Sequence, residues 1–575
     1  MPARLLLAGA TVSLLACAHD DPRRFKLAAP VLRDQDLDFV SVPCRPDPSK
    51  KDPNRIACAP KDYESSFAWD GADNTIFRPV SKFFQVTPGG EAVNVNAFDE
   101  VPDSSWFENR IGARDIDPEE AARGYCPAGT ELTDDPPDGS WYVDHGKDNG
   151  ANPGFRVVVK GTKFMLKTDD IQVERATAAT AIASRLYYAA GWWAPCDAVV
   201  YFKRTALKLA PGLTVKANVG PARPFDEEAL TAVLARTGRR GELYRATASR
   251  WLPGRTLGPF TYAGVRDDDP SDVIPHEDRR DLRGARVIAA WLNHFDAREQ
   301  NTMSTWMPEN PDNPKSQGYV RHWYIDLGDC FGSEWDIDAF SRRLGHTFVL
   351  DFGHISEDFI TLGAKKRPWE TSQRTPGAEI FGYFNSYDFD PHAWKSEYPN
   401  PAFGRMTEHD AAWAARIIAR FTPEHVAAAV RVGNFTNPAH TEWLTKVLIE
   451  RQRLILRRYF SKLSPITDVS VEGKSICAVD LARRTGVLPA DSFKYSGMVS
   501  RVGNAPSPIP VTPEANGRVC FPLPSMIPNE GPPDGGPERY VVVKIKNGTG
   551  SGALVLHLYD LGPTRGMRLA GIERE

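Results

Sequence analysis

Two short stretches of the chain carry oxygen-bearing side chains at spacings that suit metal and phosphate chemistry. Residues 291–301 contain Asp296 and Asn301, and in residues 319–329 a strand-like run ends at Asp326, which is followed by Leu-Gly. Mg²⁺ takes carboxylate and carbonyl oxygens together with phosphate oxygens as ligands. Phosphoryl transfer also needs a carboxylate beside the attacking hydroxyl and a cation on the phosphates. The two stretches therefore indicate Mg²⁺-dependent phosphoryl transfer as the chemistry to consider.

A cation is available upstream, at the end of a predicted β-hairpin. Residues 155–167 hold two β-prone runs around a Gly-Thr turn, and the second run ends at Lys167. Apolar residues on one face predict a helix over 173–190, which a glycine then stops. A further helix is expected over 277–295, directly before Asp296. The lysine and the acidic residues thus follow one another on a hairpin, a helix and a helix-to-loop junction.

This order resembles that of divergent protein-kinase-like folds. His294, Asp296 and Asn301 stand at the spacing H-x-D-x-x-x-x-N of a kinase catalytic loop, and Ile-Asp-Leu-Gly at 325–328 resembles the metal-binding D-F-G turn. Over about residues 146–465 the chain resembles phosphatidylinositol 3/4-kinases and kinases of the HipA and CotH types.

The resemblance implies an α+β fold whose core is two-lobed and protein-kinase-like, with a β-rich N-lobe and an α-rich C-lobe. It also implies ATP and Mg²⁺ as cofactors. The implied roles are Asp296 as catalytic base, Asn301 and Asp326 as Mg²⁺ ligands, Lys167 on the α- and β-phosphates, and Glu174 as the residue that orients Lys167. The structural alternative is that these residues only cap helix and strand ends or lie on an exposed edge strand.

The chain departs from the kinase pattern at two places and offers one competing motif. Phe295 stands where H-R-D has arginine, and residues 146–154 contain glycines but no G-x-G-x-x-G. Asp-Phe-Gly-His-Ile at 351–355 matches the metal turn of lipid kinases more closely than the Asp326 turn does. It lies about twice as far beyond Asn301, which is long for the hairpin that joins the catalytic loop to the metal turn. The sequence therefore favours Asp326.

The N-terminus predicts export and lipid attachment. Residues 1–17 combine Arg4 with an uncharged, mostly apolar run, and Leu-Leu-Ala-Cys at 14–17 resembles the bacterial lipobox. We expect Cys17 to carry the lipid and to anchor the chain to a membrane. Because Ala18 rather than Asp follows it, we expect the outer membrane, with the protein facing the periplasm or the cell surface.

Length and composition predict several domains. We expect, after the signal peptide, a Pro-rich tether (18–75), an N-terminal extension (76–145), an N-lobe (146–260), a C-lobe (261–465) and a C-terminal β-domain (466–575). The formal net charge of −4 argues against a nucleic-acid partner, which normally requires a basic stripe. Because export permits disulfides, we expect Cys44 to pair with Cys58 and Cys477 with Cys520, each within one local segment.

Two functions are compatible with these features. The first is an exported phosphotransferase that uses ATP or a related nucleotide and Mg²⁺. The second is a catalytically inactive, pseudokinase-like lipoprotein with a binding or structural role, which the missing glycine motif and the scarcity of periplasmic ATP favour. Nothing in the sequence identifies the phosphoryl acceptor.

Overall fold

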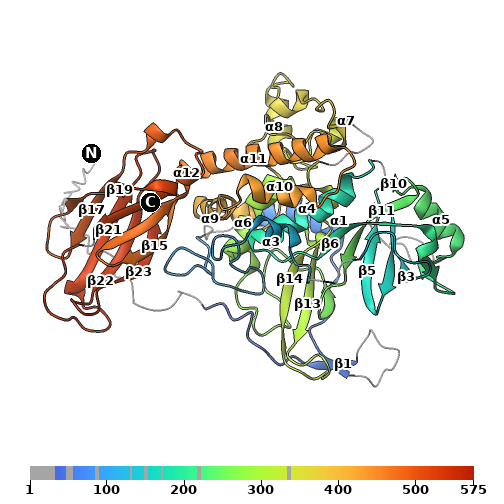
Figure 1. The fold of residues 1–575 in the computed structure, drawn as a ribbon, viewed down its shortest axis with the longest axis horizontal. Coiled ribbons are helices and arrows are strands. Elements are labelled where there is room, and N and C mark those ends of the chain that lie inside the picture. Colours follow the sequence, from blue (N-terminus) through green and yellow to red (C-terminus); the bar gives the residue numbers. More distant parts are fainter. Residues whose placement is uncertain are drawn as a thin grey trace, which may run out of the picture.

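The computed structural model describes residues 33–575 except 47–55, 84–89, 128, 130–131, 148–152, 170–171, 216–221, 333–337 and 523. The predicted lipidation site, Cys17, lies outside the described residues. The fold is a mixture of helices and antiparallel sheets, which confirms the predicted α+β class. In Figure 1 a sheet-rich part, a helical part and a C-terminal β-domain lie side by side.

The sheet-rich part is built on one seven-stranded sheet. Its strands run in the order β10-β11-β5-β4-β3-β7, and β6 pairs with β11. The bounds are β3 Trp141–Gly146, β4 Gly154–Val159, β5 Thr162–Lys167, β6 Asp197–Phe202, β7 Leu207–Leu209, β10 Arg239–Arg240 and β11 Leu243–Arg250. Alternate residues of β5 such as Phe164 and Leu166 are buried, as the period of two along a strand requires. Two short strands, β8 (Thr214–Val215) and β9 (Arg223–Pro224), and helix α5 (Glu227–Ala235) complete this part.

Helix α4 (Arg175–Ala190) connects β5 to β6 and belongs to the largest hydrophobic core. Fourteen of its residues are buried, because it packs between the sheet and the helical part. That part holds α6 Arg280–Leu292, α9 Glu408–Ile418, α10 Pro423–Arg431 and α11 Pro438–Phe460, with the shorter α3 Pro118–Arg123, α7 Asp338–Ser341 and α8 Phe352–Ile360. The long α11 leads toward the β-domain (Figure 1).

A separate three-stranded sheet follows in the order β12-β13-β14. Its strands are β12 (Arg255–Gly258), β13 (Thr302–Pro308) and β14 (Gly318–Tyr324), and β13 and β14 form a hairpin from Thr302↔Tyr324 to Pro308↔Gly318. The hairpin starts directly after Asn301 and ends two residues before Asp326, so it places these two predicted metal ligands at the same end.

Two antiparallel sheets with a common core form the C-terminal β-domain. The first is ordered β15-β16-β20-β19 and the second β18-β17-β21-β22-β23. Their bounds are β15 Ile466–Glu472, β16 Ser475–Asp480, β17 Ser496–Arg501, β18 Ser507–Ile509, β19 Thr512–Pro513, β20 Arg518–Pro522, β21 Tyr540–Lys546, β22 Leu554–Asp560 and β23 Met567–Arg574, with α12 Leu481–Arg484 after β16.

The N-terminal segment is more structured than the predicted tether. Strands β1 (Cys44–Pro46) and β2 (Ile56–Cys58) pair, and α1 (Phe67–Ala72), a π-helical turn η1 (Asp73–Phe77) and α2 (Arg78–Phe83) follow one another without a break. Ser65 donates to Glu299 over 2.8 Å, and the buried Asp70 accepts from Gln300 over 3.3 Å. The expectation of little structure over 18–75 is therefore wrong for residues 63–72, because their polar side chains bond to the loop after α6.

Three disulfides hold the described chain. Cys44–Cys58 and Cys477–Cys520 are the two predicted pairs, and Cys126–Cys196 closes a further loop. Cys330 is a buried free thiol. Disulfides form in oxidising compartments, so the three bonds are compatible with an exported protein. Within the described part of the chain, no helix has the length and apolar character needed to cross a bilayer.

Candidate functional site

The structure brings the predicted phosphate-binding lysine to the predicted metal turn. Lys167 is the last residue of β5, and its Nζ lies 2.6 Å from Oδ1 of Asp326, 159 positions further along the chain. Asp326 follows β14 and has a left-handed backbone (φ 56°). Few non-glycine residues adopt this conformation, and functional sites are where it tends to persist. The turn aims the Asp326 carboxylate at the end of β5.

Electrostatics keep Asp326 ionised. Burial alone would raise its pKa, but the charge and hydrogen bond of Lys167, with Lys147 and Arg298 as further cations, lower the pKa to about 2. The Asp326 side chain keeps 42% of its surface accessible, whereas Lys167 keeps 17%. An ionised carboxylate that still faces an opening is what a metal or a phosphate-bound cation requires.

Asp296 and Asn301 form a second pair in the loop that follows α6. Asn293 ends the helix with a left-handed backbone (φ 53°), and the chain then turns toward β13. Asn301 Nδ2 donates to Asp296 Oδ2 over 2.6 Å and to the Asp296 carbonyl over 2.8 Å. Because its nitrogen is used in this way, Asn301 fixes the carboxylate of Asp296 and leaves its own amide oxygen as a candidate ligand.

The other oxygen of Asp296 is buried and has no hydrogen-bond partner among the described residues. It lies 3.4 Å from His294 Nε2, which is likewise buried and unpartnered, while His294 Nδ1 lies 2.9 Å from the hydroxyl of Tyr187. Burial lowers the pKa of His294 to about 3, so the ring is neutral at physiological pH. Burial also raises the pKa of Asp296 well above its ordinary value, and Asp329 adds to this by repulsion. A carboxylate with a raised pKa is suited to accept a proton.

Two residues of the site were missed in the sequence. Asp329 lies three positions beyond Asp326, keeps 40% of its side chain exposed, and is 3.7 Å from Nη2 of Arg175. Lys147 follows β3, and burial and the nearby Lys167 lower its pKa to about 8. Two features of the sequence could have indicated them: a second aspartate in residues 319–329 and a lysine in the glycine-containing residues 146–154.

The predicted ion pair between Glu174 and Lys167 is not formed. Glu174 lies one residue before α4 with a left-handed backbone (φ 73°), and its carboxylate accepts the backbone N–H of Thr436 over 3.0 Å. Lys167 pairs with Asp326 instead. The physical reason is the position of the helix start. Because α4 begins at Arg175, Glu174 lies before its first turn, and its side chain does not point toward the end of β5.

The competing motif at 351–355 has a structural role in the fold. Asp351 is the N-cap of α8, where Oδ1 accepts the N–H of His354 over 3.1 Å and Oδ2 pairs with Lys395 at 2.6 Å. Ser, Thr, Asp and Asn are favoured at this position for that reason.

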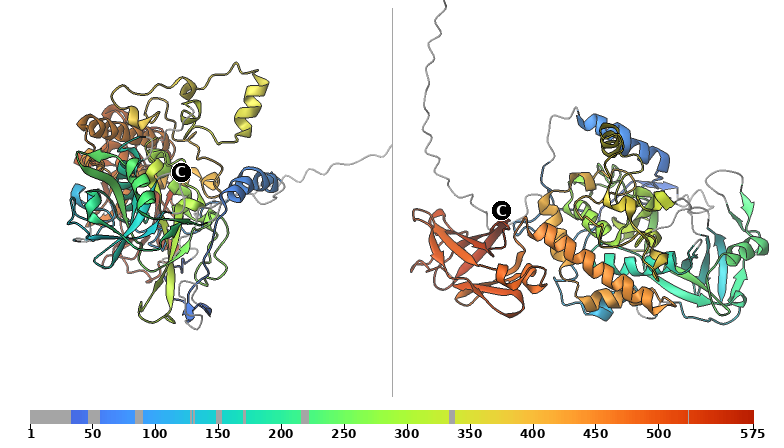
Figure 2. Two further views of the ribbon diagram at one scale, coloured as in Figure 1. Left: turned by 90° about the vertical axis from the view of Figure 1, so that its right-hand side faces the viewer. Right: turned by 90° about the horizontal axis from the view of Figure 1, so that it is seen from above.

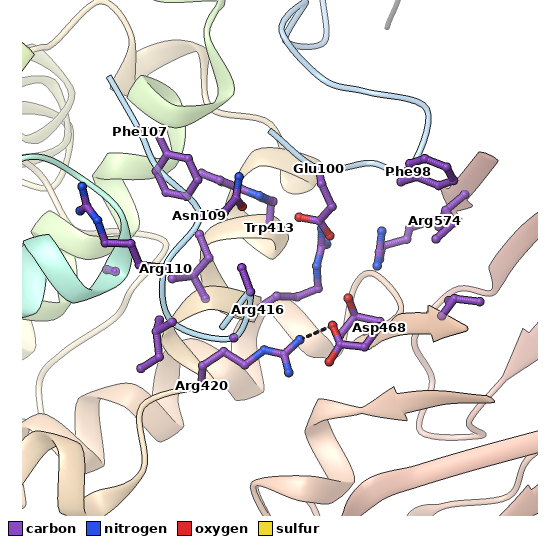
Figure 3. Close-up of a pocket in the computed structure, with 18 of the residues that line it drawn as sticks. Phe98, Glu100, Phe107, Asn109, Arg110, Trp413, Arg416, Arg420, Asp468 and Arg574 are labelled. Atoms are coloured by element: carbon purple, nitrogen blue, oxygen red, sulfur yellow. Dashed lines mark hydrogen bonds and ion pairs between the residues drawn. The ribbon is translucent and has the colours of Figure 1, made fainter. Parts of the chain in front are cut away.

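Two neighbouring cavities lie apart from this cluster. A hollow of about 450 Å³ lies where residues 98–113 pass between α9 and the β-domain, next to one of about 580 Å³. Figure 3 shows Arg416, Arg420 and Arg574 around the first hollow, with Arg420 bonded to Asp468. These charges are paired across the junction between the domains, so the hollow is a feature of that junction.

Comparison with protein-family models, with curated proteins and with solved structures gave no match. Function must therefore be argued from the site. Among the described residues, no three His, Cys, Asp or Glu side chains gather closely enough to hold a metal alone. The oxygen donors of Asp326 and Asn301 fit Mg²⁺ only as a partial ligand set, completed by phosphate and water, which is how Mg²⁺ is commonly bound beside nucleotides.

Proposed function

We propose that the protein is an exported phosphotransferase with a kinase-like core, which uses a nucleoside triphosphate, ATP in the first instance, and Mg²⁺. The observation that carries the proposal is the meeting of Lys167 and Asp326 at 2.6 Å beside the hydrogen-bonded pair Asp296 and Asn301. Lys167 is far in sequence from the other two segments, which the hairpin β13–β14 joins to each other.

The order of elements supports the kinase-like core. Strands β5, β11 and β6 lie side by side, and α4 connects the lysine strand β5 to β6. The hairpin β13–β14 joins Asn301 to the Asp326 turn, which is the connection that the kinase resemblance requires. The motif residues thus follow the order of a kinase along the chain, and the fold brings Lys167 to Asp326.

The residues of the chain have separate tasks in this proposal. Lys167 places a positive charge on the phosphates, and Asp326 and Asn301 would hold Mg²⁺, which when bound neutralises charge on the phosphates. Asp296 orients the acceptor hydroxyl and takes its proton, and Asn301 keeps the Asp296 carboxylate in one orientation. His294 is neutral and lies behind Asp296, so it adds no positive charge that would lower the pKa of the base.

We further propose that Cys17 is lipidated and anchors the protein to the outer membrane. The lipobox-like string supports this, and the three disulfides are compatible with an extracytoplasmic location. The orientation, toward the periplasm or the cell surface, stays a prediction.

An inactive binding protein is the second candidate, and one observation favours it. Lys167 and Asp326 pair with each other, so each charged group already has a partner without nucleotide. A scaffold that kept the shape of a kinase would show the same pair and would not bind Mg²⁺-nucleotide.

Asp326→Asn is expected to weaken Mg²⁺-dependent ATP binding by about 10–100-fold, because the substitution removes a metal-binding charge. Calorimetric titration of the chain from Ala18 onward, with and without Mg²⁺, measures this. Asp468→Asn is the matched control, since Asp468 also has a left-handed backbone (φ 53°), a 2.6 Å partner in Arg420 and a 40% exposed side chain. If the folded wild-type chain binds no nucleotide in either condition, the inactive candidate replaces this proposal.

A further inference from the structure

Apart from Tyr387, the large hydrophobic side chains of the described protein that are at least half exposed lie in or just after two helical segments. Helix α8 contains no buried residue. Phe359 and Ile360 in it are 81% and 79% exposed, and Leu362 just after it is 91% exposed. Leaving large apolar side chains in water is unfavourable, so we infer that a helix which exposes all three has a partner outside the described chain.

The second segment is the continuous helical run 67–83. Trp69, Phe77 and Val80 are each more than half exposed, and the rings of Trp69 and Phe77 stack with their centroids 5.5 Å apart. The stacking places these residues on one side of the run. Together with Phe359, Ile360 and Leu362 they define what we call the apolar face: Phe67, Trp69, Phe77, Val80, Phe359, Ile360 and Leu362.

Both segments project from the same side of the molecule. In Figure 2 the yellow helix α8 and the blue helical run 67–83 both project to the right in the left-hand view, with α8 above the run, and both lie at the top in the right-hand view. Residues 395–398 link them: Glu397 accepts the N–H of Val349, just before α8, over 2.7 Å, and Tyr398 bonds to Asp70. The two parts of the apolar face thus lie on one side of the molecule and are linked through residues 395–398.

The apolar face adjoins the candidate site. Arg298, two residues after Asp296, pairs with Glu397, and its guanidinium lies 4.7 Å from the ring centre of Phe67. Whatever covers the apolar face therefore lies next to the loop that carries the proposed base.

We propose that the apolar face docks on the surface of the bilayer to which Cys17 anchors the chain, and that the candidate site works on an acceptor at that surface. The inference rests on the lipid anchor of the proposed function. Only residues 18–32 separate Cys17 from the first described residue, and at 3.3–3.6 Å per residue they reach about 50 Å at most. A tether of that length keeps the protein at high local concentration beside the lipid.

Charge next to α8 also suits lipid. Two exposed lysines follow Leu362: Lys365 pairs with Glu357, whereas Lys366 forms no ion pair with any described residue. A basic residue beside an apolar helix face favours anionic headgroups. Exposed apolar patches commonly mark protein or membrane contacts; the tether and Lys366 favour the membrane.

The test uses the chain from Ala18 onward, made without acyl groups, which contains every residue that the structure describes. It is sedimented with sucrose-loaded vesicles of phosphatidylethanolamine and phosphatidylglycerol at a 3:1 ratio. We expect the wild-type chain to bind and the triple variant Phe359→Ser, Ile360→Ser, Leu362→Ser to partition at least tenfold more weakly. The control variant Val471→Ser, Met498→Ser, Val502→Ser alters side chains of the β-domain that are about 40% exposed, and it should bind as the wild type does.

Two results would overturn the inference: equal binding by the wild-type and the α8 variant, or no binding by the wild type. Sedimentation equilibrium on the same samples gives a third contradicting result. If the wild-type chain forms a dimer and the α8 variant does not, the apolar face binds a second copy of the chain rather than a bilayer. None of these readouts uses nucleotide, so a failed ATP titration leaves this result standing. Mass spectrometry of the acylated, full-length product tests the anchor at Cys17 separately.

Discussion

Asp99→Ala is expected to lower the free energy of unfolding by about 3–5 kcal/mol. Asp99 is buried at the meeting point of the N-terminal extension, the helical part and the β-domain, where it pairs with Arg280 and Arg574 at 2.5 Å and with Arg416 at 3.5 Å. Its removal leaves three buried guanidinium groups short of a counter-charge. Such a loss is much larger than that of an exposed ion pair, which is worth at most about 1 kcal/mol.

Denaturant unfolding followed by tryptophan fluorescence measures this loss. The control is Asp38→Ala, which removes an exposed pair with Arg33 and should change stability by less than about 1 kcal/mol. A loss for Asp99→Ala no greater than that of the control would contradict the view that Asp99 joins the three parts of the fold.

The same residue predicts a pH dependence. Burial opposes ionisation of Asp99, but Arg280, Arg574 and Arg416 outweigh it and hold the pKa of the carboxyl well below its usual range. The stabilisation is then complete above the unfolded pKa of about 3.9 and is lost as pH falls toward the lower folded value. Wild-type stability should therefore drop more steeply below about pH 4 than that of Asp99→Asn, which acid unfolding curves would show.

Asp296→Asn is expected to slow phosphoryl transfer by about 10²–10⁴-fold, the usual contribution of a general base. The asparagine oxygen can still accept the hydrogen bond from Asn301 Nδ2 that Asp296 accepts now, so the loop and the affinity for nucleotide should persist. Only the ability to take the proton is lost.

Single-turnover release or transfer of the γ-phosphate from radiolabelled ATP measures this step, with nucleotide affinity measured in parallel. Because burial and Asp329 raise the pKa of Asp296, and only the ionised form accepts a proton, the wild-type rate should fall as pH decreases through that raised value. Asp351→Asn, at the N-cap of α8, should leave the rate within a factor of three. An unchanged rate in Asp296→Asn would remove Asp296 from the reaction.

Local patterns in the sequence were sufficient to predict the elements that carry the site. The hairpin ending at Lys167 and the turn at Asp326 follow from β-prone runs with short breaks, and the structure joins them at 2.6 Å. The disulfides Cys44–Cys58 and Cys477–Cys520 could also be predicted. Each joins two strands that pair with each other in one sheet.

Features set by long-range packing could not be predicted in this way. The Cys126–Cys196 bond spans 70 positions, and the Asp99–Arg574 pair spans 475. Glu174 was given the wrong partner because the helix starts at Arg175, two residues later than predicted, and the side chain of Glu174 turns toward Thr436. Residues 63–72 resembled a tether because their composition is polar, whereas their polar groups in fact bond to the loop beside Asp296.

The most direct test of the central claim is to ask which lysine lies at the phosphates of bound nucleotide. An acyl-phosphate derivative of ATP transfers its acyl group to a lysine amine next to the phosphates and releases ATP, and peptide mass spectrometry then locates the label. We expect labelling of Lys167 and of Lys147, whose lowered pKa of about 8 makes its amine the more reactive, and we expect excess ATP and Mg²⁺ to suppress both labels. Label spread over surface lysines, and indifferent to excess ATP, would contradict a nucleotide site between Lys167 and Asp326.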